Sequence, residues 1–260
     1  MNVQHFFHRA TGTLTYLVSD RGEAVIIDPV LDYNEGKVAT TSLQQVINAV
    51  IEQGVALKYI LETHIHADHL SAALAAKNAL GGKTAISRKI TDVYETWSSK
   101  LNCQPLAQFD VLLDEGDELS LGGEKVLVLS TPGHTPADLT YHIDDSIFVG
   151  DTLFAPKRGT ARADFPGGSA EDLYRSISRL FELPEDTHVY LCHDYPSENE
   201  EPELCSSLST QKNDNVMINM SVTEKQYIEI RSNRDSNLAT PKLLDVAIPF
   251  NLTYQLPSIT

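Results

Sequence analysis

The sequence has few cysteines, no surplus of positive charge and no long apolar run. Its three cysteines, among 260 residues, are an odd number at wide spacing, which predicts reduced thiols rather than a disulfide framework. Asp and Glu number 36 against 20 Lys and Arg, giving a net charge of −16. This acidity argues against binding to nucleic acid or to an anionic membrane. No apolar run approaches the roughly 18 residues of a membrane span.

The first twenty residues also lack the basic, apolar and small-residue regions of a signal peptide. Together with the reduced cysteines, this predicts a cytoplasmic protein. A hydrophobic content of 42% and a charged content of 22% are ordinary for a globular chain. The length suffices for one large domain or two small ones.

Strand and helix patterns alternate through the first three quarters of the chain. Residues 13–18 and 24–29 are β-branched and apolar around a turn, which predicts a hairpin. Apolar residues at helical spacing predict a helix over 41–53, closed by Gly54, and a second one over 70–80. Gly122-Gly123 separates two further strand patterns. The alternation indicates an α/β protein.

Histidine and aspartate follow directly on four apolar strand patterns. The densest group is His64-Ile65-His66-Ala67-Asp68-His69, and the others bring His134, Asp151 and His193. Five of the nine histidines therefore lie at strand ends, where a rigid sheet meets variable loops and catalytic groups gather. Because imidazole and carboxylate are ligands of zinc and iron, the pattern predicts a metal centre.

Three other side chains have simpler interpretations. His8 has no acidic or cysteine neighbour in sequence and is predicted to lie on the surface. Cys192 precedes His193, but consecutive residues of an extended segment point to opposite faces, so we expect a buried thiol. Asp28 ends its strand where the site residues end theirs, and it either orients a ligand histidine or closes a turn.

The character of the chain changes after Tyr195. Residues 197–209 are acidic and loop-like, and no role is indicated for them. Ser221 to Glu224 resembles a capping box that starts a helix, and residues 243–252 are apolar. Because this tail has too little apolar content to fold alone, we expect 196–260 to pack on a catalytic core of residues 1–195 within one domain.

His-x-His-x-Asp-His followed by a lone His, an Asp and a final His resembles the metallo-β-lactamase superfamily. The resemblance covers residues 13–195 and implies a four-layer αββα sandwich with metal at one edge. For dinuclear members it implies two metals bridged by Asp151. The implied ligand sets are His64, His66 and His134 for one metal, and Asp68, His69 and His193 for the other.

Within the superfamily, three stretches resemble the persulfide dioxygenases more than the glyoxalase II thioesterases. These are the Ala-Asp-His form of the motif in 64–71, the Arg-x-Asp-Phe loop in 159–168 and the His-Asp-Tyr in 192–195. The chain is most similar to a bacterial subgroup labelled β-lactamase hydrolase-like. Asp151 stands where common β-lactamases carry cysteine, which disfavours antibiotic hydrolysis.

The dioxygenase resemblance implies one Fe(II) per chain on His64, His134 and Asp151, with open positions for a persulfide sulfur and O₂. Glutathione persulfide would then give sulfite and glutathione, a reaction of sulfide detoxification. Four more side chains become groups that orient ligands and water: His66, Asp68, His69 and His193. The alternative is a glyoxalase II-like hydrolase, in which these four hold part of a dinuclear zinc or iron site and hydroxide attacks a thioester.

Arg162 and Tyr195 are the candidates for substrate contact. A guanidinium fork suits a carboxylate of glutathione, although Arg162 has an ion pair with Asp164 as its alternative. Tyr195 either hydrogen-bonds substrate or packs at a strand end. The resemblance also allows a homo-oligomer. A catalytically silent, metal-stabilised protein is disfavoured because every ligand position is intact.

Overall fold

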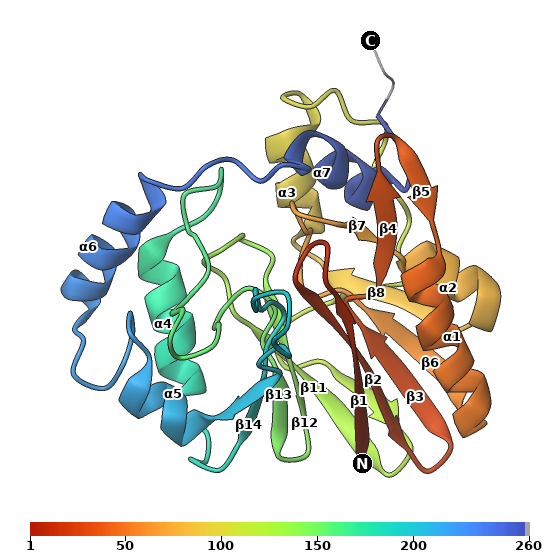
Figure 1. Ribbon diagram of the computed structural model, residues 1–260, viewed down its shortest axis with the longest axis horizontal. Coiled ribbons are helices and arrows are strands. Elements are labelled where there is room, and N and C mark those ends of the chain that lie inside the picture. The colour runs from red at the N-terminus through yellow and green to blue at the C-terminus, as the bar shows by residue number, and fades with distance from the viewer. Residues whose placement is uncertain (258–260) are drawn as a thin grey trace.

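Two six-stranded sheets lie face to face at the centre of the computed structural model, which describes residues 1–257 (Figure 1). The first sheet has the order β1-β2-β3-β6-β8-β9. Its strands are β1 (Asn2–His8), β2 (Thr13–Asp20), β3 (Glu23–Ile27), β6 (Ala56–Leu61), β8 (Lys83–Ser87) and β9 (Val111–Leu113). Strands β3, β6, β8 and β9 run parallel, and β1 to β3 form an antiparallel meander.

The second sheet has the order β10-β11-β12-β13-β14-β15. Its strands are β10 (Glu118–Leu121), β11 (Glu124–Ser130), β12 (Leu139–Ile143), β13 (Ser146–Phe148), β14 (His188–Tyr190) and β15 (Cys205–Ser207). All its pairs are antiparallel except β13 with β14. A small third sheet joins β5 (Lys37–Ala39), β4 (Val30–Asn34) and β7 (Leu70–Ser71).

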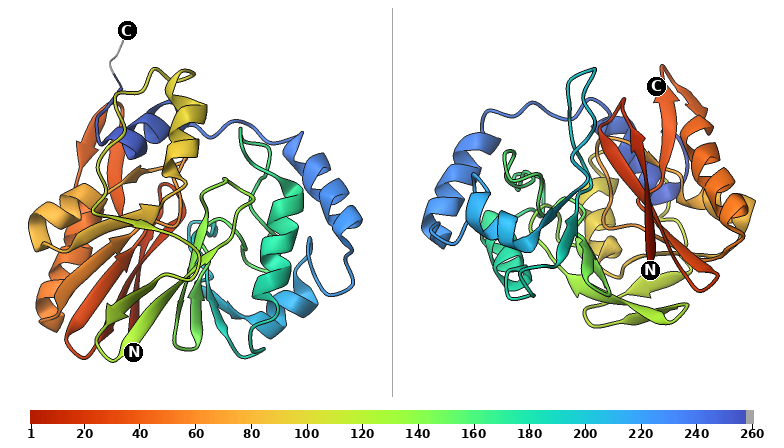
Figure 2. Two further views of the ribbon diagram at one scale, coloured as in Figure 1. Left: turned by 180° about the vertical axis from the view of Figure 1, so that it is seen from behind. Right: turned by 60° about the horizontal axis from the view of Figure 1, so that its bottom comes forward.

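Helices cover the outer face of each sheet (Figures 1 and 2). Helices α1 and α2 lie outside the first sheet, and α4, α5 and α6 lie outside the second. The helices are α1 (Thr41–Gln53), α2 (Ala73–Leu80), α3 (Ile90–Ser98), α4 (Ala170–Leu180), α5 (Leu208–Asp214), α6 (Glu224–Asp235) and α7 (Leu244–Thr253). The predicted four-layer αββα architecture is confirmed.

Strand β2 shows how the layers arise from the sequence. Leu14, Tyr16 and Val18 belong to the core that joins the two sheets, whereas Leu17 belongs to the core beneath α1 and α2. Successive side chains of a strand point to opposite faces. Because both faces of this strand are covered, it carries apolar residues on both, as strands at the centre of layered folds do.

Several predicted elements have the predicted bounds. Helix α1 spans Thr41–Gln53 and ends at Gly54, whose φ of 64° is the left-handed conformation that glycine adopts at little cost. Strands β10 and β11 form the hairpin expected around Gly122-Gly123. The helix expected from residue 70 instead begins at Ala73, because Leu70–Ser71 pair with β4 as strand β7.

The tail is more regular than the sequence predicts. The expectation of a loop throughout 197–209 is wrong, because Cys205–Ser207 pair with β14 as the edge strand β15 and α5 follows at once. The capping box lies two residues further on than predicted, between Thr223 and Gln226. Among residues 1–257, no helix has both the length and the apolar character needed to cross a membrane.

Candidate metal centre

The predicted site residues follow the ends of strands from both sheets and converge on one point. The loop that carries His64 to His69 runs from β6 to β7, while His134 follows β11. Asp151 and His193 follow the parallel neighbours β13 and β14. All five of the predicted histidines are buried, with at most 4% of their surface exposed.

One group consists of His64, His134 and Asp151, whose ligand atoms all lie within 4.8 Å of one another. The Nδ1 atom of His64 lies 3.0 Å from the Thr63 hydroxyl, and Nδ1 of His134 donates to the Arg162 carbonyl at 2.8 Å. Each ring is thus held through Nδ1, so Nε2 remains available as a ligand atom. Nε2 of His134 lies 3.7 Å from the Asp151 carboxylate.

A second group consists of His66, Asp68, His69 and His193, whose ligand atoms also lie within 4.8 Å of one another. His66 falls in this group rather than with His64 and His134, where the dinuclear arrangement implied by the resemblance would place it. The rings of His64 and His66 are nevertheless neighbours, with centroids 4.0 Å apart. The two groups therefore adjoin.

Buried ligand atoms in this region have no hydrogen-bond partner among residues 1–257. They are Nδ1 of His66, Oδ2 of Asp68, Nε2 of His69, Oδ1 of Asp151 and both ring nitrogens of His193. Buried polar atoms are rarely left unpaired in native proteins, and imidazole nitrogen with carboxylate oxygen is a donor set for zinc and iron. The residues therefore fit a bound metal.

At His64 and His69 the electrostatics favour the neutral imidazole that a metal requires. Burial lowers the pKa of His64 well below its ordinary value, and the neighbouring imidazoles lower it further. Burial likewise lowers the pKa of His69 to about 4, although Asp68 opposes this shift. Burial would raise the pKa of Asp68, but His193 and His69 hold it well below its ordinary value.

Asp28 supports the site from behind. Its carboxylate accepts hydrogen bonds from the backbone N–H and the hydroxyl of Thr63, both at 2.8 Å, and lies 3.2 Å from Nε2 of His66. Burial lowers the pKa of His66, but Asp28 and Glu62 outweigh it and raise the pKa well above its ordinary value. Asp28 thus holds His66 through Nε2, and Nδ1, which has no partner among residues 1–257, remains available to a metal, as expected if Asp28 orients a ligand histidine.

A cavity of about 250 Å³ opens beside both groups. Arg162 and Tyr195 both line it, as do His134 and Asp151. The Arg162 guanidinium is already paired with Asp164, at 2.6 and 2.8 Å, so the ion-pair alternative is formed. Tyr195 is 53% exposed, and its ring stacks on that of His193 at a centroid distance of 6.0 Å.

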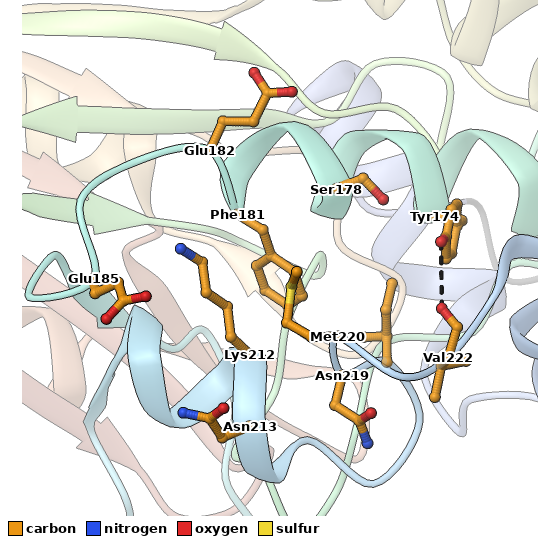
Figure 3. Close-up of a pocket in the computed structure, with 11 residues that line it drawn as sticks. Tyr174, Ser178, Phe181, Glu182, Glu185, Lys212, Asn213, Asn219, Met220 and Val222 are labelled. Atoms are coloured by element: carbon orange, nitrogen blue, oxygen red, sulfur yellow. Dashed lines mark hydrogen bonds between the residues drawn. The ribbon is translucent and has the colours of Figure 1, made fainter.

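A different cavity, of about 330 Å³, lies between α4, α5 and the segment that precedes α6 (Figure 3). Phe181 and Met220 line it, and Tyr174 donates a hydrogen bond to the Val222 carbonyl across its edge. None of the predicted site residues borders it. This cavity is therefore separate from the metal centre.

The family model that matches this chain is the metallo-β-lactamase superfamily, over residues 8–193. The chain belongs to this superfamily. A crystal structure of ETHE1 from Myxococcus xanthus superimposes with a TM-score of 0.81 and 31% identity, covering 98% of this chain and 99% of that one. The structural match extends beyond residue 193, into the C-terminal tail.

Relatives of this metallo-β-lactamase protein have different names. A probable metallo-hydrolase of Burkholderia pseudomallei is 42% identical over 97% of this chain and 92% of its own length. Glyoxylase B2 of Dictyostelium discoideum is 40% identical over 94% of this chain and 86% of its own length. The human mitochondrial persulfide dioxygenase ETHE1 is 30% identical over 96% of this chain and 87% of its own length. The chain spans about 60% of the length of bacterial relatives named β-lactamase hydrolase-like protein.

Asn251 of α7 holds the metal-binding loop of this metallo-β-lactamase fold, a role that the sequence did not reveal. Its amide nitrogen donates to the carbonyls of His66 and His69 at 2.9 and 2.8 Å. Its amide oxygen accepts from the Ser71 N–H at 2.7 Å. Asn251 is 2% exposed, so these bonds replace water entirely, and α7 fixes the loop.

His8 is not the isolated surface residue that the sequence predicts. Its side chain is 10% exposed and lies 3.5 Å from Asp32. A line of hydrogen bonds leads from its ring to Thr11 (2.7 Å), on to Thr13 (2.8 Å) and then to Nδ1 of His69 (3.3 Å). The prediction failed because each of these contacts depends on how β1 and β2 fold over the loop.

Cys192 and Glu62 are two further buried groups beside Asp28. Cys192 is 2% exposed, and burial raises the pKa of its thiol well above the ordinary value, which confirms the expected buried thiol. Glu62 was overlooked, although its spacing of four residues from His66 was a signal. Its carboxylate lies 3.5 Å from Nε2 of His66 and accepts a hydrogen bond from the Ser71 hydroxyl.

Proposed function

We propose that this protein is a persulfide dioxygenase that uses one Fe(II) held by His64, His134 and Asp151. The observation that carries the proposal is this group of two histidines and one carboxylate, which is the donor set of non-haem iron oxygenases. His134 and Asp151 also line the cavity, so a small molecule can approach them. The similarity to proteins named ETHE1 over nearly the whole chain supports the same assignment.

His64, His134 and Asp151 would hold the iron, which would supply the redox chemistry that O₂ requires and that zinc lacks. The proposed substrate is the persulfide of a low-molecular-weight thiol, glutathione persulfide above all. O₂ accepts four electrons from the persulfide, and the terminal sulfur is oxidised to sulfite. With one water consumed, the S–S bond breaks, the thiol is released and two protons leave.

The chain's own residues orient the ligands and shape the site. The carbonyl of Arg162 fixes the ring of His134, and Asp28 fixes that of His66. Asp68 is held ionised beside His193, at 3.5 Å, where its carboxylate can accept a hydrogen bond from water or substrate. Tyr195 covers His193 from the solvent side. Such preorganisation brings two reactants together without a three-body encounter.

A second candidate, hydrolysis of an acyl-glutathione thioester, is favoured by one specific observation. The ligand atoms of His66, Asp68, His69 and His193 also lie within 4.8 Å of one another, and a second metal held there would help to activate water for attack on a thioester. The relative named Glyoxylase B2 supports this reading. The same side chains thus serve either reaction, and the number and type of metal separate them.

Oxygen uptake by anaerobically Fe(II)-loaded protein given glutathione persulfide tests the proposal. We expect consumption of O₂ with formation of sulfite, lost in Asp151→Ala and retained in Asp145→Ala, a control at an exposed aspartate far from the centre. His69→Gln, in the second group, should leave one iron per chain. No uptake, together with cleavage of S-lactoylglutathione by a two-metal form, would establish the hydrolase instead.

A further inference from the structure

Four arginines line the cavity beside the metal centre, and three of them are occupied by the protein itself. Arg158 and Arg162 each pair with an aspartate. Arg231 is 1% exposed and pairs with Asp235 at 2.6 Å. Arg234 differs from these, because it is exposed and has no ion pair or side-chain hydrogen bond within residues 1–257.

The cavity wall therefore contains arginine N–H donors that have no acceptor within the described residues. Acidic side chains outnumber basic ones by 36 to 20, so partners for an arginine are abundant, yet Arg234 has none among the described residues. Nε of Arg231 is buried beside the same cavity and also lacks a hydrogen-bond partner in the described chain. A buried N–H without an acceptor is unfavourable, so an acceptor bound in the cavity would complete this wall.

The end of α6 that carries these donors is fixed in place. Arg231 donates to the Thr160 carbonyl at 2.8 Å, and Asp235 accepts from the Ala163 N–H at 3.0 Å. Both bonds tie the helix to residues 160–163, a segment of which Thr160, Ala161 and Arg162 line the same cavity. Arg234 lies between these two anchors, so its backbone is positioned before any ligand arrives.

We propose that Arg234, with Arg231 behind it, forms a carboxylate-binding subsite for the thiol carrier of the substrate. The proposed iron ligands His134 and Asp151 line the same cavity as Arg234, so the sulfur of an extended carrier such as glutathione would react at the former while its carboxylate binds Arg234. A guanidinium matches a carboxylate with charge-assisted hydrogen bonds. The identity of this ligand rests on the proposed function.

Calorimetric titration of the metal-free full chain with S-methylglutathione tests the subsite, because the methylated sulfur does not react and no turnover is needed. The comparison ligand is the same molecule with both carboxylates as methyl esters. We expect wild type to bind the diacid roughly tenfold more tightly than the diester, as one charge-assisted contact allows. Arg234→Gln should reduce this preference to about twofold or less. Lys225→Gln, an exposed position on the same helix with the same change in charge, should keep it.

The proposal is overturned if Arg234→Gln retains the preference for the diacid, if Lys225→Gln loses it equally, or if wild type binds neither ligand. Circular dichroism of each variant verifies the fold. Failure of the proposed function gives a different pattern, since the carboxylate preference would persist while oxygen uptake is absent. Oxygen uptake without a preference that depends on Arg234 would instead remove only the subsite.

Discussion

Replacing Asn251 by leucine should loosen the metal-binding loop without removing any metal ligand. The change keeps the volume and the helix but deletes the bonds to the carbonyls of His66 and His69 and to the Ser71 N–H. A buried backbone group left without a partner costs roughly 1–3 kcal/mol. Three such groups therefore lower the free energy of unfolding by at least about 3 kcal/mol.

Part of this loss should appear in metal affinity, because the metal must then order a loop that α7 no longer holds. If ordering the loop takes about 1.4 kcal/mol from the free energy of metal binding, the affinity for the metal falls about tenfold. Urea unfolding of the metal-free protein measures the first quantity. Competition with a chelator, followed through the absorption bands of bound Co(II), measures the second under conditions where the variant is folded.

Thr253→Val is the matched control for this experiment. Thr253 is buried on the same helix, and its hydroxyl donates to the Pro249 carbonyl at 2.7 Å without touching the loop. It should lose about 1 kcal/mol of stability and keep full metal affinity. If Asn251→Leu also keeps the wild-type affinity and Co(II) spectrum, Asn251 contributes to stability alone and does not support metal binding.

Three other substitutions test the surroundings of the site. Asp28→Asn should weaken metal binding by about 10–100-fold because it misorients its neighbours, and unchanged affinity in the chelator assay would remove Asp28 from this role. In the metal-free protein the pKa of His69 is about 4 against an ordinary 6.5, so the unfolded chain binds a proton that the folded one rejects. Stability should therefore fall by up to about 3 kcal/mol as pH drops from 6.5 towards 4, and His69→Gln should flatten that part of the curve, whereas an unaltered slope would disprove the assignment. Gly12 has φ of 70°, and a Cβ there would lie 2.6 Å from the Asp194 carbonyl and the Tyr195 ring. Gly12→Ala should thus lose at least about 1 kcal/mol and displace the ring in a crystal structure; wild-type stability would show that the loop yields freely.

The candidate metal ligands could be predicted from the sequence because their signal is local. Each follows an apolar strand within a few residues, and the strands of the two packed sheets that carry them end at the same edge of the sandwich. The motif 64–69 alone places three imidazoles and a carboxylate within six residues. The order of the later residues, His134, Asp151 and His193, then indicated the family and with it the layered fold.

The supporting residues could not be identified in this way, because tertiary contacts alone define them. Asn251 is 180 positions from Ser71, which it binds, and a lone asparagine in an apolar helix carries no signal. Arg234 resembles any exposed helical arginine until the cavity is seen. Strands β7 and β15 have two and three residues, too few for a periodicity to be detected.

The bonds between Asn251 and the loop also order events during synthesis. The ribosome makes the first histidines of the centre about 180 residues before it makes the asparagine that holds them, and His134 and His193 appear in between. A growing chain that has not reached α7 therefore contains every metal ligand but lacks the helix that fixes their loop. By the same physics as in Asn251→Leu, a metal captured at that stage would be held less tightly, and its retention would depend on the arrival of α7.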